Sequence, residues 1–345
     1  MTEPVVTVVV VNYRSGRHLH GCLEALLSQD QGMPFEVIVV DNASGDDSFA
    51  VARTAAGAGR LTAIESDRNL GLAGGVNLAL EQARGRYVAV LNPDTLTRAG
   101  WLLPLVEVMD GDASIGVACP LVLMTGTNRI NSAGQHIHIS GLGFNRLLAA
   151  PMTKAGDRVH EVPGLHGACF LVRTELLRKL GGWDETGFLY QEDVALSWSI
   201  RLAGASIVCV PDARVDHDYS LTMYPEKLYL LERNRWMLLA THLRLPTRLL
   251  IGPFLILSEL LVLGLCVLRG PRFLGAKWNA VRWFLMHRPQ WVAWRTRIES
   301  FRSTEDQSLL ASQRWTYPLS QFFTLGAERG ESRRQPPGGL PTEAG

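Results

Sequence analysis

The chain has 345 residues, of which 47% are hydrophobic and 19% are charged, and its formal net charge is +1. A chain of this length buries a sizeable core without disulfides, and 33 glycines and 17 prolines exclude a collagen-like or wholly disordered protein. The charge is uneven, because residues 1–225 carry a net −7 and residues 226–302 a net +9. We expect two tasks, with the basic part facing nucleic acid or an anionic membrane.

The five cysteines are widely spaced, so the sequence contains no CxxC metal or redox motif. An odd number of scattered cysteines is typical of a reducing compartment, where cysteine serves as a small buried apolar residue. We expect no secretory signal peptide, because Glu3 stands where positive charge belongs and the apolar run 5–11 is short.

The first ninety residues alternate between β-branched apolar runs and segments with helical spacing. The pattern predicts strands at 5–11, 35–40, 61–65 and 87–91, and helices at 17–29, 47–57 and 75–84. This alternation predicts an α/β fold with a mainly parallel sheet and helices on both faces. Ligands bind such sheets at the carboxyl ends of strands, so the polar residues that follow the strands are the first candidates for a site.

The middle of the chain is less regular. Residues 125–165 are rich in glycine, which indicates irregular structure or short antiparallel strands. Residues 168–179 begin as a strand and become helical, 191–203 predict a helix, and 206–210 predict a further strand.

Beyond Glu226 the sequence becomes basic and apolar. The 20-residue run Leu249–Leu268 is long enough to span a membrane, but Glu259 lies near its centre. An acid there costs roughly 2.5–3.5 kcal/mol or more. Three interpretations remain: a true span, a buried helix of a soluble region, and a helix in the headgroup layer. We favour the third, with peripheral or monotopic attachment.

Two aspartates directly follow predicted strands. Asp41 comes after FEVIVV, and Asp94 comes after YVAVLNP. A carboxylate in this position can accept a hydrogen bond from a nucleobase or sugar, or hold a divalent cation against a diphosphate. The alternative is a helix N-cap, and the sequence leaves both interpretations open.

The segment 69–77 is rich in glycine. Gly71, Gly74 and Gly75 allow the backbone to approach a ligand closely, and the following helix offers N–H groups to an anion. The alternative is a tight turn. The segment is not the GxGxxG fingerprint that follows the first strand in nicotinamide-dependent oxidoreductases.

Two further candidates lie in the second half of the chain. Glu192 and Asp193 begin a predicted helix after an aromatic stretch, where a dry cleft would raise a carboxyl pKa toward general-base use. The alternative is a pair that interacts with the helix dipole. His217 follows a strand between two aspartates and is either a metal ligand or a structural histidine.

Taken together, these signals carry a family resemblance. The chain resembles the family-2 glycosyltransferases of the GT-A fold in seven segments that occur in the same order: VVVVNYRSG, VDNASGDDS, NLGLAGGVN, VLNPDT, HGACFLVR, GGWDETGFLYQEDVAL and VDHDYS. The likeness covers about residues 5–240 and is greatest to the bacterial rhamnosyltransferase-like branch. It implies a Rossmann-like GT-A catalytic domain over 1–225, followed by a basic, Trp-rich, membrane-associating helical region over 226–315. We expect residues 326–345 to form a disordered tail.

The resemblance also implies roles for individual residues. The expected donor-nucleotide contacts are Asn12, Asp41, Arg68, Asn69, Gly74 and Asn77. Asp94 and His217 would hold a divalent cation, Mn²⁺ or Mg²⁺, and a mixed Asp/His set favours Mn²⁺. Asp193 would be the catalytic base with Glu192 in support. The expected acceptor side comprises Gly167, Ala168 and Trp183.

The chain departs from the family pattern at two positions near the expected base. Ala195 replaces the second acid of Glu-Asp-Val-Asp-Leu, and Ser199 stands where arginine is common, so the acceptor contacts stay open. Residues 232–236 faintly resemble the QxxRW signature of processive synthases, with glutamate in place of glutamine. We therefore favour single transfer over processive synthesis.

The implied activity is inverting transfer of rhamnose or a related hexose from a dTDP- or UDP-sugar to a hydroxyl of a lipid-linked or polysaccharide acceptor. The expected location is the cytoplasmic face of the bacterial inner membrane, with an anionic membrane surface and no nucleic acid as partner. Positive charges interleaved with apolar runs argue against a phosphate-binding face for nucleic acid. Alternatives are a polyprenyl-phosphate sugar synthase, an inactive nucleotide-sugar-binding module and, less favoured, a nucleotidyltransferase, which usually has a glycine-rich phosphate loop after the first strand.

Overall fold

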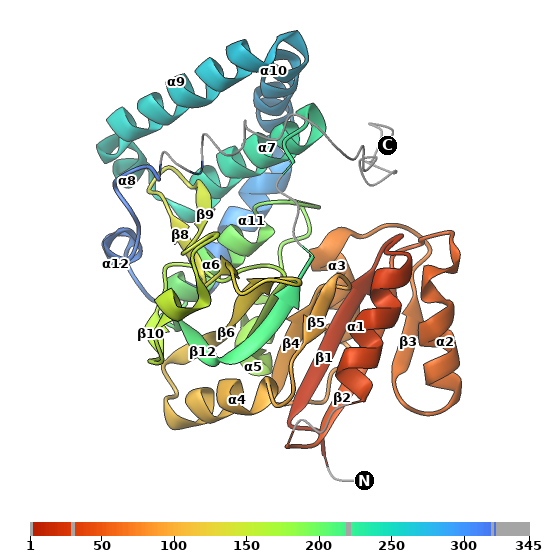
Figure 1. The fold of residues 1–345 in the computed structure, drawn as a ribbon. Coiled ribbons are helices and arrows are strands. Elements are labelled where there is room, and N and C mark those ends of the chain that lie inside the picture. The colour runs from red at the N-terminus through yellow and green to blue at the C-terminus, as the bar shows by residue number, and fades with distance from the viewer. Residues whose placement is uncertain (1–2, 29–31, 219–221, 319–320, 322–345) are drawn as a thin grey trace.

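A computed structural model describes residues 3–28, 32–218, 222–318 and 321, and the expected tail at 326–345 lies outside them (Figure 1). The first part of the chain alternates strands and helices as expected. Its elements are β1 (Val6–Asn12), α1 (Arg17–Leu27), β2 (Phe35–Asp41), η1 (Asp47–Phe49), α2 (Ala50–Gly57), β3 (Thr62–Glu65), α3 (Gly71–Leu80) and β4 (Tyr87–Leu91).

The middle part adds several short strands and two long ones. In chain order it comprises β5 (Thr95–Thr97), α4 (Leu102–Gly111), β6 (Ile115–Met124), β7 (Ile130–Ser132), β8 (Gln135–Ile137), β9 (Gly143–Asn145), β10 (His160–Glu161), β11 (Cys169–Arg173), α5 (Thr174–Leu180), α6 (Glu192–Leu202) and β12 (Ser206–His217). The C-terminal part is helical, with α7 (Pro225–His242), α8 (Leu245–Leu250), α9 (Gly252–Arg269), α10 (Pro271–Met286), α11 (Arg288–Phe301) and α12 (Asp306–Ala311).

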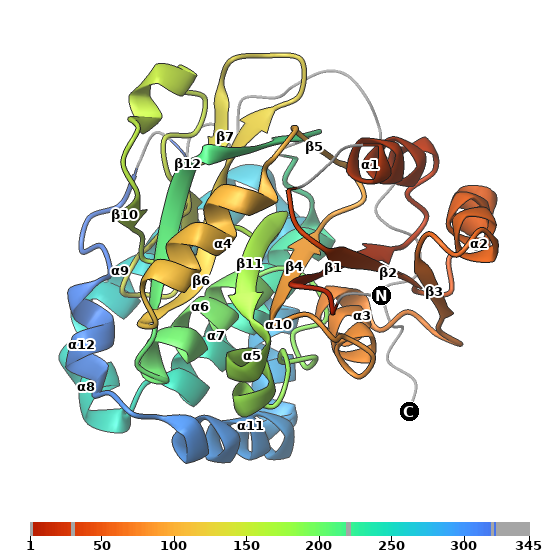
Figure 2. The same cartoon turned by 90° about the horizontal axis from the view of Figure 1, so that it is seen from below.

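A single large sheet runs through the molecule in the order β10-β12-β6-β11-β4-β1-β2-β3. It is mainly parallel, since β1 pairs in parallel with β2 and β4, and β12 with β6, whereas β11 is antiparallel to its neighbours β4 and β6. Helices cover both faces, with α1, α2 and α4 on one side and α3, α5 and α6 on the other (Figure 2). This confirms the predicted α/β architecture.

Among the elements that differ from the sequence-based expectation, α3 and β6 bear on the packing of the sheet. Helix α3 begins at Gly71 and not at residue 75, so the glycine-rich segment forms its first turns. A Cβ on Gly75 would lie 2.6 Å from Cγ1 of Val11, which shows that this glycine allows close packing of the helix on β1. Strand β6 was not predicted, because Gly116 and Pro120 interrupt its apolar run. The sheet accommodates the proline where the register with β12 shifts, after Val210.

The C-terminal helices are joined by four charged side chains. Glu232 and Arg235 of α7, Glu259 of α9 and Lys277 of α10 form a cluster in which each acid pairs with both bases. Arg235 Nη2 lies 2.8 Å from Glu232 Oε2, and Lys277 Nζ lies 2.6 Å from Glu259 Oε2. Although burial alone would raise the pKa of Glu232, the two cations lower it to about 2. The cluster therefore fixes α9 against α7 and α10 and turns Glu259 inward.

Removing one acid from this cluster should destabilise the protein. In Glu232→Leu, Arg235 and Lys277 would share a single carboxylate in a buried setting, which costs about 3–5 kcal/mol of unfolding free energy. Chemical denaturation followed by circular dichroism measures this loss. Glu226→Ala, at an exposed position of the same helix, is the matched control and should change stability by less than about 0.5 kcal/mol. Equal stability of the two variants would contradict the role given to the cluster.

Candidate active site

Asp41 ends β2 at the carboxyl edge of the sheet and is held by a polar network. Its Oδ1 accepts hydrogen bonds from Asn12 Nδ2 at 2.6 Å and Ser44 Oγ at 2.6 Å, and its Oδ2 accepts from the Ser44 N–H at 3.0 Å. Asp46, and not Asp41, caps the next helical turn, since its side chain accepts from the Ser48 N–H. The helix-cap alternative for Asp41 is therefore wrong. Asn12 is fully buried, so in this structure it positions Asp41.

The remaining expected donor contacts lie around the start of α3. Arg68 is exposed, and Asn69 Oδ1 accepts the Gly71 N–H at 3.0 Å, which shapes the turn into the helix. Asn77 uses its amide to hold the chain before α6: Nδ2 donates to the Trp183 carbonyl at 2.9 Å, and Oδ1 accepts the Trp183 N–H at 2.8 Å. A Cβ on Gly74 would lie 2.7 Å from Leu70 Cβ, so this position is closely packed.

Asp94 and His217 are brought together by strand pairing. In the antiparallel ladder between β5 and β12, Thr95 lies opposite His217, which places the preceding Asp94 beside the imidazole. His217 Nε2 lies 3.4 Å from Asp94 Oδ1, and His217 Nδ1 lies 2.9 Å from Asn131 Oδ1. The next helix, α4, begins after Trp101 and has no side-chain cap. Asp94 is therefore not a helix cap either.

The Asp94–His217 pair fits a divalent cation. Asp94 Oδ1 is shielded from solvent and faces His217 Nε2 at 3.4 Å, so a carboxylate oxygen and an imidazole nitrogen that can both bind a divalent cation lie side by side. Burial alone would raise the pKa of Asp94, but the hydrogen bond and charge of His217 outweigh it and keep the pKa low. Within the described ranges, no three His, Cys, Asp or Glu side chains converge on one point. The remaining ligands of such a cation would therefore come from the donor's diphosphate or from water.

Asp193 and Glu192 start α6 and lie at the wall of a cavity. Asp193 Oδ2 accepts from Gln135 Nε2 at 2.7 Å and from the Gly167 N–H at 3.3 Å. Oε2 of Glu192 is buried and makes no hydrogen bond within the described part of the chain. Burial raises the pKa of both acids, and the charge of Asp193 raises that of Glu192 further. The pair therefore holds a proton near neutral pH more readily than ordinary carboxyl groups do.

The acceptor-side residues divide into two groups. Gly167 contacts Asp193 directly, and the Ala168 carbonyl accepts the Asn92 N–H at 2.9 Å, so this segment lies between the base and the strand that leads to Asp94. Trp183 is 2% exposed and packs edge-on against Phe170. Its indole N–H donates to the Glu192 carbonyl at 2.9 Å. In this structure Trp183 thus supports α6 from within the core and does not line the cavity.

The chain that leads into α6 adopts an unusual backbone. Phe188, Tyr190 and Gln191 have φ angles of 60°, 65° and 64°, a left-handed region that side chains with a Cβ disfavour. This segment also contacts the start of α3, because the Phe188 carbonyl oxygen occupies the space that a Cβ on Gly71 would need. Strained backbone of this kind clusters at functional sites.

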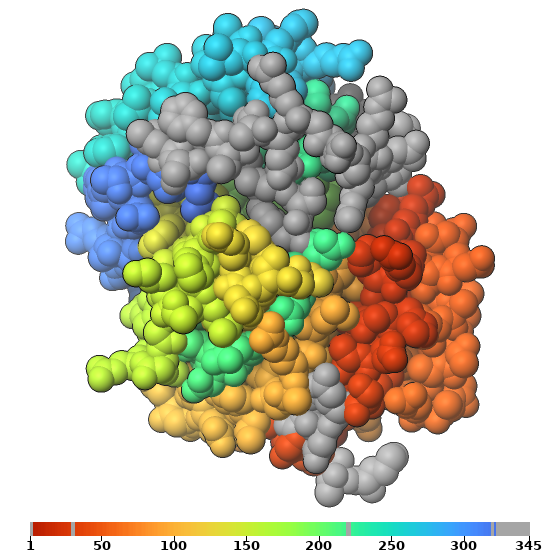
Figure 3. Space-filling view, in the orientation of Figure 1, coloured from red at the N-terminus to blue at the C-terminus, as the bar shows by residue number. Residues whose placement is uncertain are grey.

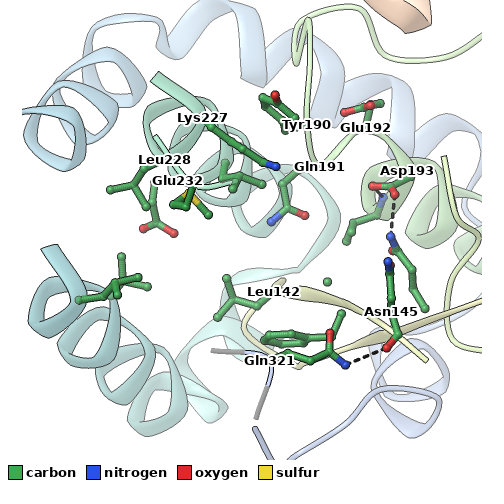
Figure 4. A pocket seen from close by; sticks show the side chains of 18 of the residues that line it. Leu142, Asn145, Tyr190, Gln191, Glu192, Asp193, Lys227, Leu228, Glu232 and Gln321 are labelled. Atoms are coloured by element: carbon green, nitrogen blue, oxygen red, sulfur yellow. Dashed lines mark hydrogen bonds between the residues drawn. The ribbon is translucent and has the colours of Figure 1, made fainter. Parts of the chain in front are cut away.

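A cavity of about 260 Å³ begins at Asp193 and extends to the C-terminal helices (Figure 4). Its walls come from β8, β9, α6, α7 and α9. Two polar residues that line it, Gln135 and Lys227, were not found by sequence reasoning. Gln135 lies in the glycine-rich region 125–165, and its approach to Asp193 depends on the pairing of β8 with β9, which no local sequence pattern predicts.

Comparison with known proteins indicates the family of the chain. The family model described as Glycosyl transferase family 2 matches residues 7–181, about half of the chain. N-acetylglucosaminyl-diphospho-decaprenol L-rhamnosyltransferase of Mycobacterium tuberculosis is 30% identical over 239 residues, covering 63% of this chain and 76% of that protein. The O-antigen biosynthesis protein RfbC of Myxococcus xanthus is 26% identical over 225 residues, covering 63% of this chain and 17% of that protein.

Solved structures with low identity share the fold. GalNAc-T7 with UDP, GalNAc and Mn²⁺ has a TM-score of 0.56 at 18% identity, covering 70% of this chain and 48% of that one. The Staphylococcus aureus TarS fragment 1–349 with UDP-GlcNAc has a TM-score of 0.54 at 18% identity, covering 90% and 93%. The mannosyltransferase PcManGT from Pyrobaculum calidifontis with GDP-Man and Mn²⁺ has a TM-score of 0.51 at 19% identity, covering 87% and 86%.

The family match covers half of the chain, and the rhamnosyltransferase relative aligns over most of its own length. The solved structures share the fold of this chain, and the family match includes the strands that end at Asn12, Asp41 and Leu91. This chain belongs to glycosyltransferase family 2, in its rhamnosyltransferase-like branch, and is a glycosyltransferase with the GT-A fold.

Proposed function

We propose that this chain transfers L-rhamnose or a related hexose from a dTDP- or UDP-sugar to a hydroxyl of a lipid-linked or polysaccharide acceptor, with inversion at the anomeric carbon. One observation carries the proposal: a buried acid pair and an Asp/His pair lie on either side of the Gly167–Ala168 segment at the carboxyl edge of the sheet. The name of the Mycobacterium tuberculosis relative, a rhamnosyltransferase that acts on a decaprenol-linked acceptor, supports the sugar and the lipid-linked acceptor.

The proposed reaction is a single displacement. Asp193 takes the proton of the acceptor hydroxyl, and that oxygen forms a bond to the anomeric carbon as the bond from this carbon to the diphosphate oxygen breaks. Attack opposite the leaving group inverts the configuration. Asp41 would accept a hydrogen bond from the nucleobase, since its carboxylate lies at the carboxyl edge of the sheet, where ligands of such sheets bind.

The leaving diphosphate has to be stabilised as it departs. Asp94 and His217 would hold Mn²⁺ or Mg²⁺ beside it, and such a cation neutralises charge that builds up on the leaving group. An imidazole nitrogen in the ligand set favours Mn²⁺. The Gln135 hydrogen bond keeps Asp193 oriented toward the cavity, where the acceptor hydroxyl would lie.

We further propose that α9 and α10 attach the protein to the cytoplasmic face of the inner membrane. Among the described helices, α9 alone is long and apolar enough to cross a bilayer. Its inner side packs on α7 and α10 through Glu259, whereas its outward residues are 44–86% exposed: Ile256, Leu260, Leu263, Val267 and Leu268. These two helices form one end of the molecule (Figure 3). A one-sided apolar face with arginines nearby suits a helix lying in the membrane plane.

The first test combines nucleotide binding with sugar transfer. Calorimetry with UDP, dTDP and GDP, each with and without Mn²⁺, should show metal-dependent binding of one nucleotide class, which Asp94→Asn reduces. Mass spectrometry should show transfer from the matching sugar nucleotide. Asp193→Asn should lower the rate about 10²–10⁴-fold, because the proton acceptor is lost, and leave nucleotide binding unchanged. Asp157→Asn, an exposed acid, is the control. Unchanged turnover in Asp193→Asn would overturn the assignment of the base.

The pH profile should respond differently to two substitutions beside Asp193. Asp193 acts only when ionised, so kcat/KM falls as the pH drops through its pKa. The charge of Asp193 raises the pKa of Glu192, so Glu192 is still protonated when Asp193 ionises, and Glu192→Gln should leave the acid limb in place. Gln135→Leu removes a hydrogen bond to the carboxylate, raises the pKa of Asp193 and should move the acid limb to higher pH. An acid limb that moves in Glu192→Gln, or stays in place in Gln135→Leu, would contradict the proposed network.

Membrane attachment should depend on the outward face of α9. The double variant Leu260→Glu/Val267→Glu should lower the partition coefficient onto phosphatidylglycerol vesicles at least about tenfold, because each buried aliphatic side chain contributes about 1.5 kcal/mol or more. Vesicle sedimentation measures it. Leu103→Glu on α4 is 38% exposed in the wild type and serves as the control that should bind normally. Equal vesicle binding by wild type and the double variant would overturn the assignment.

A further inference from the structure

The cavity beside Asp193 has an apolar wall that reaches away from the acid pair. This wall comprises Leu142, Leu148, Leu228, Leu231, Val262 and Leu265. The last two belong to α9, the helix whose opposite side is exposed. A glycan acceptor would gain little from such a wall, because its surface is covered with hydroxyl groups. The wall instead suits a hydrocarbon chain that arrives from the side of α9.

Lys227 places a positive charge in this otherwise apolar region. It is half-buried, and its Nζ lies 5.0 Å from the centre of the Tyr190 ring. Figure 4 shows the side chain reaching from α7 toward Tyr190 and Gln191. Among the described residues that line the cavity it is the only lysine or arginine, and no described carboxylate lies within 4.0 Å of it.

None of the nearby described acids forms an ion pair with Lys227. Glu232 is paired with Arg235 and Lys277, and Asp193 accepts hydrogen bonds from Gln135 and from the Gly167 N–H. Burial lowers the pKa of Lys227, since its surroundings disfavour the ammonium form. A bound anion would relieve this cost, so the site favours a ligand that brings negative charge to Lys227.

We propose that Lys227 binds a phosphate group of a prenyl-type lipid carrier, whose first hydrocarbon units lie along the apolar wall while the acceptor hydroxyl faces Asp193. This inference rests on the proposed function and narrows its acceptor to an anionic amphiphile. Lys227 is a specificity-determining residue here, because its charge selects a phosphate-bearing acceptor over a neutral glycan.

Binding without a donor tests the proposal independently of sugar transfer. We would titrate the whole protein with farnesyl diphosphate, farnesol and inorganic pyrophosphate, in the presence of Mn²⁺ and a saturating concentration of the nucleoside diphosphate that binds, so that the donor site is already occupied. The wild type should bind farnesyl diphosphate at least tenfold more tightly than either of the other probes. Lys227→Ala should remove this preference, and Lys227→Arg should retain it within about threefold, since the charge is kept. Binding of farnesol should be unchanged in Lys227→Ala.

Other outcomes overturn the proposal. The proposal is wrong if wild type and Lys227→Ala bind farnesyl diphosphate equally, or if Lys227→Ala loses farnesol binding to the same extent. It is also wrong if only pyrophosphate binds tightly to the wild type, or if farnesyl diphosphate does not bind to it. Lys179→Ala, an exposed lysine on α5, controls for a general loss of positive charge. Lys227→Gln, which keeps most of the side-chain length, gives a second variant if the alanine protein is unstable. Sugar transfer that persists without a Lys227 effect would refute this inference alone, whereas prenyl diphosphate binding without transfer would refute the proposed function alone.

Discussion

The burial of β1 on both faces is the constraint on which the rest of the structure depends. All seven of its residues are buried, so helices must cover the sheet on both sides, and parallel partners must occupy both of its edges. Asn12 is the last residue of this strand and lies opposite Asp41, the last residue of β2. Polar side chains therefore gather at the carboxyl edge of the sheet, because a polar group buried among apolar side chains without a hydrogen-bond partner costs free energy.

The same separation of apolar and charged groups governs the C-terminal helices. The four charges between α7, α9 and α10 balance one another, which lets an apolar helix carry Glu259 without exposing it. Glu232 also lines the cavity, yet its negative charge is already matched there. The acid pair of α6 has no such cations, so its carboxyl groups stay reluctant to ionise. The pKa of the buried acid on α7 is thus lowered and the pKa values of the buried acids on α6 are raised, because only the acid on α7 has cationic partners.

Local patterns predicted the parts of the site that follow strands or begin helices. Asp41, Asp94, Asp193 and His217 are each signalled by an adjacent apolar run, and the structure brings Asp94 to His217 as expected. Gln135 and Lys227 were missed because their positions depend on contacts between distant segments. For the same reason, the sequence could not reveal that Asn77 and Trp183 hold the chain before α6. Periodicity reports which face of an element is buried, but not which distant side chain meets it.

The left-handed backbone before α6 has a thermodynamic consequence. This segment contacts α3 through Phe188 and lines the cavity through Tyr190. Each residue with a left-handed φ costs roughly 1–2 kcal/mol of conformational free energy, so a ligand that changes this backbone from either side would also change that free energy. Linkage then requires reciprocity: if an occupied donor side alters affinity in the cavity by some factor, a filled cavity alters donor affinity by the same factor. A transferase with such coupling would bind its two substrates interdependently, through one short stretch of backbone.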